Sequence, residues 1–199
     1  MSDNHQQVRA FIAIELPQAA REGLARLEDA LRRPEHRCVK WVSPEGIHLT
    51  LKFLGNVPAG RVPEVGAAVA EAARNVPPFR LEIAGTGVFP GLKQVRVFWV
   101  GIGGEVDRLR ALQGSIDSAL ATLGFAREDR PFVPHLTLAR VRQGASPGER
   151  RSFGELVDSV VFEEKHGIDV RAVSLMRSQL TSAGAVYTRL SSVELGGRS

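Results

Sequence analysis

The tetrapeptide His-Leu-Thr-Leu occurs twice in this chain, at residues 48–51 and again at residues 135–138. In each copy the apolar residues alternate with polar ones, a pattern typical of a β-strand with one buried face. Because alternate residues of a strand share a face, His48 and Thr50 should point to one side. The repeat therefore predicts two amphipathic strands, each with an imidazole beside a hydroxyl and hydrophobic residues behind them.

The two copies lie far apart, so each half of the 199-residue chain carries one. We expect a single catalytic domain over residues 1–199, made of two pseudo-symmetric lobes that face a common cleft. Two imidazoles suit a displacement reaction, because a neutral one accepts a proton from the nucleophile and a protonated one supplies the leaving group. Either strand alone could equally be an ordinary amphipathic strand with a polar face.

A phosphate ester fits such a pair of imidazoles. In phosphoryl transfer the attacking and leaving oxygens lie roughly in line, and negative charge builds up on the oxygens between them. Metal-dependent hydrolysis is the competing interpretation, but the two histidines lack a carboxylate at metal-ligand spacing. The segment GIGGE has neither the spacing nor the Lys-Ser/Thr of a nucleotide-binding P-loop.

The composition sets broader limits. The net charge of +4 and the isoelectric point near 9.8 fit an anionic partner such as RNA without requiring one. The N-terminal segment has no signal-peptide pattern, and no apolar run approaches a membrane span, so we expect a cytoplasmic protein with no membrane contact. Cys38 is the only cysteine, which excludes an intrachain disulfide and suggests a buried, unreactive thiol. A monomer is expected.

Helical and strand patterns alternate along the chain, and several strands are joined by short turns. This favours an α+β fold with largely antiparallel sheets over a doubly wound parallel one. Strands are expected at 8–16, just before and after the turn at 44–46, at 79–89, 94–102 and 135–140, and as a closing hairpin of 169–181 and 185–195. Helices are expected at 17–33, 61–76, 105–124 and, less regularly, 146–161.

With their flanks, HLTLKFLG and HLTLAR resemble the paired H-x-T-x motifs of the two-histidine phosphoesterases. Within that superfamily the resemblance is specifically to the RNA 2′,3′-cyclic phosphodiesterases, historically called 2′-5′ RNA ligases. Further similar segments cover most of the chain, namely RAFIAIELP, WVSPEGIHLTLKFLG, GVFP followed by VRVFWVGI, RPFVPHLTLAR and LMRSQLTSAGAVYTRL.

This resemblance implies a bilobal α+β fold in which two antiparallel sheets, with helices outside, flank a central cleft. It implies hydrolysis of RNA 2′,3′-cyclic phosphate ends, tRNA-like fragments included, to 2′-phosphate ends, with RNA ligation as a weaker activity. By position, His48 would be the proton donor and His135 the proton acceptor, while Thr50 and Thr137 would bind phosphate oxygens. No metal or cofactor is implied.

Other positions are secondary candidates. Arg130, in the loop before the second motif, is a candidate phosphate ligand, or else a solvated loop residue. Lys52 shares the His48 face by strand alternation, or else is an ordinary strand lysine whose charge extends to solvent. Phe53 falls on the opposite face. Arg140 is left out because alternation places it opposite His135 unless a bulge intervenes. Aromatic residues that could stack on a base, or simply fill the core, are Phe11, Trp41, Phe89, Phe132 and Tyr187.

Two alternatives remain open. The same fold could act on 2′-5′ oligonucleotides, on small cyclic phosphates, or in the ligation of tRNA-like halves. The chain could also be a non-catalytic, basic RNA-binding module whose histidines only contact phosphate. Rates on substrates of different length, and the effect of removing both histidines, would separate these alternatives.

Overall fold

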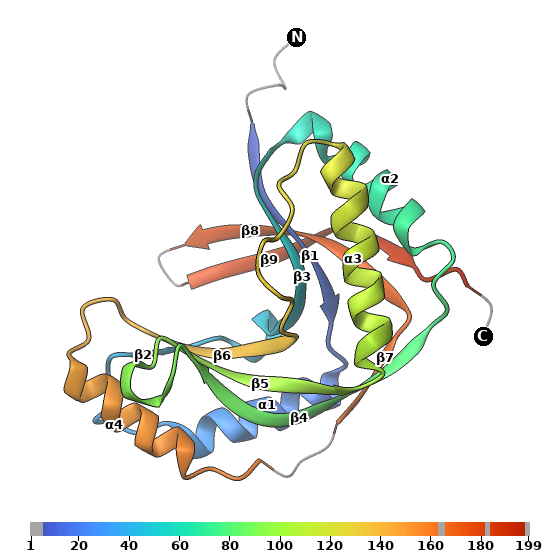
Figure 1. Cartoon of the computed structure of the whole chain (residues 1–199). Helices are drawn as coiled ribbons and strands as arrows, with labels where there is room; N and C mark the ends of the chain where they lie inside the picture. The colour runs from blue at the N-terminus through green and yellow to red at the C-terminus, as the bar shows by residue number, and fades with distance from the viewer. Residues whose placement is uncertain (1–5, 163–165, 182–183, 198–199) are drawn as a thin grey trace.

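The chain forms two antiparallel sheets with helices packed against them (Figure 1). The computed structural model describes residues 6–162, 166–181 and 184–197. The four-stranded first sheet has the order β3 (His48–Pro58), β1 (Gln7–Glu15), β8 (Ala172–Thr181), β9 (Gly184–Glu194). The five-stranded second sheet has the order β2 (Val39–Trp41), β6 (His135–Val141), β5 (Val97–Gly104), β4 (Phe79–Phe89), β7 (Gly167–Val170). The predicted antiparallel α+β fold is confirmed.

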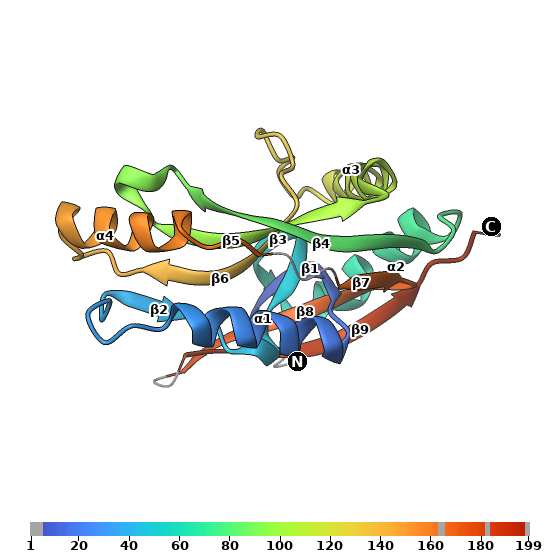
Figure 2. The same cartoon turned by 90° about the horizontal axis from the view of Figure 1, so that it is seen from below.

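Four α-helices and three short 3₁₀ helices connect the described strands: α1 (Gln18–Leu31), α2 (Val62–Ala73), α3 (Val106–Thr122) and α4 (Pro147–Asp158), with η1 (Pro44–Gly46), η2 (Ala59–Arg61) and η3 (Leu92–Gln94). Helices α2 and α3 pack on each other and contact β9 and β3 of the first sheet, and α4 contacts η3 and β4 of the second (Figures 1 and 2). In the part of the chain that the structure describes, no helix is long and apolar enough to cross a membrane.

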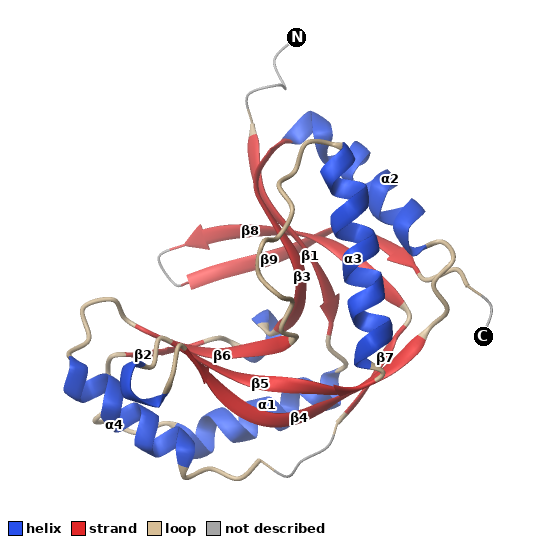
Figure 3. Cartoon of the chain, in the orientation of Figure 1, coloured by secondary structure: helices blue, strands red, loops and turns tan. Residues whose placement is uncertain are grey.

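The local sequence explains where these helices begin and what they bury. Helix α1 follows Pro17 and buries Leu24, Leu27 and Leu31, whose spacing places them on one helical face. Helix α4 begins at a capping box in which Ser146 and Glu149 satisfy each other's backbone N–H groups. The helices lie along the sheets (Figure 3). The apolar faces of α1 and α4 are buried, and their other faces are largely exposed.

Most apolar residues form one large core on the helix-covered faces of the sheets, and the Cys38 thiol is buried in it. Strand β1 alternates between this core and the other face of the first sheet: Ile12 and Ile14 point into the large core, whereas Phe11 and Ala13 form a small second cluster with Met176. His48 stacks on Phe11 of this second cluster. We call the side of each sheet that carries its motif histidine the histidine face.

The predicted closing hairpin differs from the structure at its first strand. Residues 167–170 form β7 and pair with β4 of the second sheet, while residues 172–181 form β8 and pair with β1 and β9 of the first. Arg171 separates the two strands. One extended segment thus serves both sheets, which its continuous strand-like sequence does not reveal. The predicted turn at 182–184 lies mostly outside the described residues.

Candidate active site

The two motif histidines begin neighbouring strands of different sheets. His48 is the first residue of β3 and His135 the first of β6, and these two strands contact each other where the sheets meet (Figure 1). Leu49 and Leu136 are fully buried behind the histidines, whereas Thr50 and Thr137 are half-buried on the histidine faces. The alternation expected for each motif is therefore present.

The backbone holds both imidazoles in the same way. His48 Nδ1 lies 2.8 Å from the carbonyl oxygen of Gly46, and His135 Nδ1 lies 2.7 Å from that of Val133. A carbonyl oxygen only accepts hydrogen bonds, so Nδ1 must be the donor in each case. The proton on Nδ1 leaves Nε2 of each ring as the atom that can give or take a proton in a reaction.

Aromatic rings fix the orientation of both imidazoles. The His48 ring stacks on Phe11, with centroids 4.6 Å apart, and meets Tyr187 edge-on at 4.9 Å. The His135 ring meets Phe89 edge-on at 5.2 Å, and Trp99 lies 6.1 Å away. Such contacts restrict ring rotation and thereby preorganise the two nitrogen atoms.

Trp99 reaches its position beside His135 because the facing residue on β4 is a glycine. A Cβ atom at Gly87 would lie 2.2 Å from the Trp99 ring, closer than any side chain allows. Of the other aromatic candidates, Trp41 packs against Phe98 and Phe153, and Phe132 packs against the large core. Phe11, Phe89 and Tyr187 thus serve as histidine supports, and Trp41 and Phe132 as core residues.

His48 has an altered proton affinity. Burial lowers its pKa, the Gly46 carbonyl raises it, the positive charge of Arg140 lowers it and the negative charge of Glu15 raises it, with a net result below the ordinary value of 6.5. The effect of Arg140 is informative, because Arg140 belongs to β6 of the second sheet. A guanidinium from one sheet therefore lies close enough to act on the imidazole of the other.

A β-bulge follows each motif and changes which later side chains share the histidine face. In β3, Thr50 pairs with Ala13 and Lys52 with Ile12, which leaves Leu51 as an extra residue. In β6, Leu138 is likewise skipped between the pairs Thr137 to Trp99 and Ala139 to Phe98. A bulge of this kind reverses the side-chain alternation beyond it.

The prediction that Lys52 lies beside His48 is wrong for this reason. Lys52 is buried on the core side, where its Nζ donates to Asp117 Oδ1 at 2.5 Å and to the carbonyl oxygen of Ala126 at 2.7 Å. The expected position of Phe53 is wrong as well, because its ring lies 6.1 Å from Phe11 on the histidine face and is 66% exposed. Arg140, left out by strict alternation, reaches the histidine face of β6 in the same way.

The third positively charged candidate, Arg130, is not brought to the histidines by any described contact. Its side chain is 89% exposed and its Nε lies 3.7 Å from Glu128 Oε1 in the loop before β6. The hydroxyls of Thr50 and Thr137 form no hydrogen bond with the described residues. The groups that the structure gathers are thus two imidazoles, two available hydroxyls and the Arg140 guanidinium.

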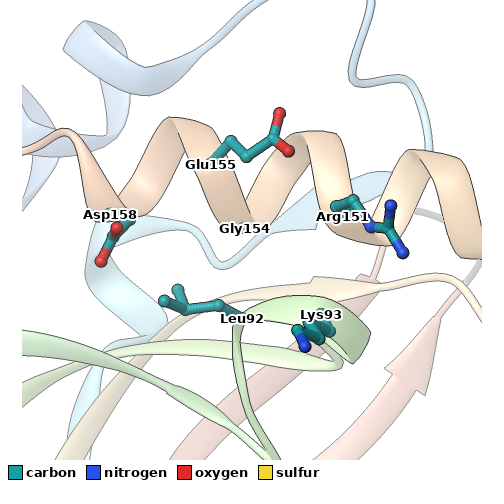
Figure 4. A pocket seen from close by; sticks show the side chains of 6 residues that line it. All are labelled: Leu92, Lys93, Arg151, Gly154, Glu155 and Asp158. Carbon is teal, nitrogen blue, oxygen red and sulfur yellow. The ribbon is translucent and has the colours of Figure 1, made fainter.

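A hollow in the surface lies elsewhere, between η3 and α4 (Figure 4). Its lining mixes both charge signs and includes neither motif: Leu92, Lys93, Arg151, Gly154, Glu155 and Asp158. Among the residues that the structure describes, no group of three or more His, Cys, Asp or Glu side chains is placed to hold a metal ion.

Comparison with known proteins gives consistent results. The family model described as LigT like phosphoesterase matches residues 14–99 and, a second time, residues 100–187. The RNA 2′,3′-cyclic phosphodiesterase of Methanothermobacter thermautotrophicus is 38% identical over 182 residues, which are 92% of this chain and 96% of that protein.

Solved structures show the same similarity. The protein TT0787 of Thermus thermophilus superposes with a TM-score of 0.78 at 32% identity, over 96% of this chain and 100% of that one. E. coli LigT complexed with 3′-AMP superposes with a TM-score of 0.74 at 26% identity, over 96% and 99% of the two chains. The two matches to the family model together cover most of the sequence, each with one H-x-T-x motif, and the chain belongs to the LigT-like phosphoesterase family.

Proposed function

We propose that this protein hydrolyses the 2′,3′-cyclic phosphate at the end of an RNA and leaves a 2′-phosphate. The observation that carries the proposal is the matched pair of imidazoles, each with its Nδ1 bonded to a backbone carbonyl and its Nε2 left for proton transfer. The name of the Methanothermobacter relative and the 3′-AMP complex of E. coli LigT support a nucleotide substrate of this kind.

In the proposed reaction, His135 Nε2 takes a proton from water as the water oxygen bonds to phosphorus. The bond from phosphorus to the ribose 3′ oxygen breaks, and His48 Nε2 gives its proton to that oxygen. The hydroxyls of Thr50 and Thr137 donate to the non-bridging oxygens, and Arg140 offers a fork of N–H donors to the same charge. Arg130 stays a weaker candidate for this role, because it lies in an exposed loop.

The lowered pKa of His48 must be reversed for it to act as an acid. In the free protein, burial and Arg140 favour the neutral imidazole. A bound phosphate brings a negative charge next to the ring, which favours the imidazolium and raises the pKa. The assignment of donor and acceptor itself rests on the family resemblance, since the hydrogen bonds of the two rings are equivalent.

In the proposed complex, the base of the terminal nucleotide stacks on the Phe53 ring. A phenylalanine at 66% exposure costs hydrophobic free energy unless something covers it, and this ring lies on the same face as His48. Stacking of a base on an aromatic ring is worth about 1–3 kcal/mol and tolerates any base. The nucleoside would thus lie over Phe53 while its cyclic phosphate reaches the histidines.

The same atoms allow ligation. If the 5′ hydroxyl of a second RNA replaces water, its oxygen bonds to phosphorus, its proton goes to His135, and the 3′ oxygen leaves with the proton of His48. The product is a 2′-5′ phosphodiester. We propose hydrolysis as the main reaction because water needs no second binding site. A cytoplasmic location and a monomeric state stay predictions.

The deciding experiment incubates the protein, with excess EDTA, with a short RNA that ends in a 2′,3′-cyclic phosphate. We expect a product heavier by one water molecule with its phosphate on the 2′ oxygen, which mass spectrometry and ³¹P NMR identify. The variants His48→Ala and His135→Ala should lose about 10² to 10⁴ in rate while keeping their circular dichroism spectrum. An unchanged RNA end in the presence of folded protein would refute the proposal, and a double histidine variant that loses only RNA affinity would support a non-catalytic RNA-binding module.

A further inference from the structure

Two positive charges lie directly opposite each other on the histidine face of the second sheet. Lys40 of β2 is paired with Arg140 of β6 in the antiparallel register. Like charges at facing positions destabilise a sheet. Among the described residues neither side chain has a carboxylate partner, and both are exposed. The pair therefore costs stability in the free protein, and an anionic ligand would relieve the repulsion.

The direction of Lys40 follows from its neighbours in β2. Val39 and Trp41 belong to the large core or pack against it, so the residue between them points to the opposite side, which is the histidine face. The Lys40 side chain also reaches toward the first sheet, because its Nζ lies 3.9 Å from the place that a Cβ atom would take at Gly184. The Lys40 ammonium thus lies beside the first residue of β9, in the hairpin of β8 and β9.

Arg140 and Lys40 lie at increasing distance from the motif histidines. Arg140 acts on His48 and is the nearer of the two, and Lys40 follows one strand farther out, at the edge of the sheet. Facing residues have Cβ atoms only about 4.5–5.5 Å apart, so two long side chains can contact neighbouring anionic groups of one ligand. Two cations of the first sheet also lie on its histidine face. Arg189 of β9 is bound to Glu15 and so already neutralised, and Arg9 of β1 pairs with Asn56, at the end of β3 away from His48.

We propose that Lys40 binds the phosphodiester that joins the terminal nucleotide to the rest of the RNA. This inference rests on the proposed function and adds to it a contact with the RNA beyond the cyclic phosphate, which a mononucleotide substrate cannot make. A mononucleotide without a 5′ phosphate presents only the cyclic phosphate, which the histidines, threonines and Arg140 already surround. A longer RNA has one further negative charge next to it, and Lys40 is the cation placed to receive that charge.

The first test compares two substrates with the variant Lys40→Met, which keeps the aliphatic stem and removes the charge. One substrate is a short RNA with a 2′,3′-cyclic end, and the other is 2′,3′-cyclic AMP. We expect kcat/KM for the RNA to fall roughly tenfold, as for the loss of one charge-assisted contact, and kcat/KM for 2′,3′-cyclic AMP to stay unchanged. Lys93→Met, at the hollow between η3 and α4, is the matched control and should change neither value.

An equal loss on both substrates would overturn the proposal, because Lys40 would then act on the cyclic phosphate itself. No loss on the RNA would overturn it as well. A binding experiment decides the same point without turnover: the affinity for a short RNA ending in a 2′-phosphate, measured against salt, should depend on salt less steeply in Lys40→Met, by about 0.7 in the logarithmic slope. If the wild-type protein turned over neither substrate, the proposed function would fail, while the binding slopes would still test Lys40.

Discussion

At the scale of single residues, the histidines are held by groups that do not take part in proton transfer. Each Nδ1 is fixed by a carbonyl two residues earlier, and two aromatic rings restrict each imidazole. For the proposed proton transfers, imidazoles held this firmly need little reorganisation when a substrate binds. Proton affinity is then set by the surroundings, which for His48 include a charge from the other sheet.

A substrate with a better leaving group should separate the roles of the two histidines. If sulfur replaces the 3′ oxygen of the cyclic phosphate, the departing thiolate needs no proton. We expect His48→Ala to regain most of its lost activity on this substrate, because His48 would only supply that proton. His135→Ala should stay at least about 10²-fold slower than the wild type, since water must still be activated. Recovery in His135→Ala alone would reverse the assignment of donor and acceptor.

Arg140 and Arg130 offer a direct comparison of two candidate phosphate ligands. Arg140→Gln should slow turnover by about 10², because it removes a donor to the developing charge, and it should raise the pKa of His48 by removing a nearby positive charge. Arg130→Gln should cost less than about fivefold, as expected of an exposed ion pair. Steady-state rates and an NMR titration of the His48 ring measure both effects, and an unmoved His48 pKa in Arg140→Gln would contradict the proximity.

At the scale of elements, the two bulges shape the site. At each bulge two successive residues are buried, where a regular strand would bury only one of them. They are Leu51 and Lys52 in β3, and Leu138 and Ala139 in β6. The bulge in β3 turns Lys52 toward α3, where it forms a buried ion pair with Asp117. The same Lys52 binds the carbonyl of Ala126, at the start of the loop that leads to His135. A residue of β3, the strand that begins with His48, thereby holds the loop that leads to His135.

Removing one member of this buried pair should destabilise the protein. Lys52→Met leaves Asp117 without its closest partner, and breaking a buried ion pair typically costs about 3–5 kcal/mol. The double variant Lys52→Met with Asp117→Leu should recover much of that loss, because no buried charge remains. Urea denaturation measures each value. Arg110→Met breaks an exposed pair with Asp107 on the same helix and should cost less than about 1 kcal/mol; equal losses in the two single variants would refute the burial argument.

Regular elements could be predicted from the sequence, whereas irregular ones could not. Apolar periodicity predicted the helices and most strands because it reports directly on burial. The repeated motif predicted that His48 and His135 lie on the polar faces of two amphipathic strands. Strict alternation then misplaced Lys52, Phe53 and Arg140, since a bulge depends on the partner strand and leaves no local mark in these sequences. The donor and acceptor roles were not readable either, because they depend on where the substrate lies.

At the scale of the whole molecule, the proposed reaction needs both sheets to act on one substrate. It requires a neutral His135 on the second sheet and a protonated His48 on the first. Both requirements are met only over a limited pH range, which predicts a bell-shaped pH profile of the rate whose limbs belong to the coupled pair.

The direction of the His48 pKa shift can also be checked from the pH dependence of the rate. Because burial lowers the pKa of His48, one limb of the kcat/KM profile, which reports the free protein, should lie below the ordinary value of 6.5. In the kcat profile the limb of His48 should move to higher pH, since bound phosphate favours the imidazolium. Rates measured from about pH 5 to 9, with chemistry limiting, test both expectations. A flat profile would argue against proton transfer by these histidines.

The strand order of the first sheet also determines at which stage of synthesis the candidate site can form. The first sheet joins β1 and β3 from the start of the chain to β8 and β9 from its end, and Tyr187 of β9 is one of the two rings that hold His48. When the ribosome has translated both motifs, it has therefore not yet synthesised Tyr187, which contacts the His48 ring. A nascent chain that has not yet reached β9 carries both proposed proton-transfer groups but lacks the Tyr187 ring, so the surroundings of His48 are complete only after β9 has been synthesised.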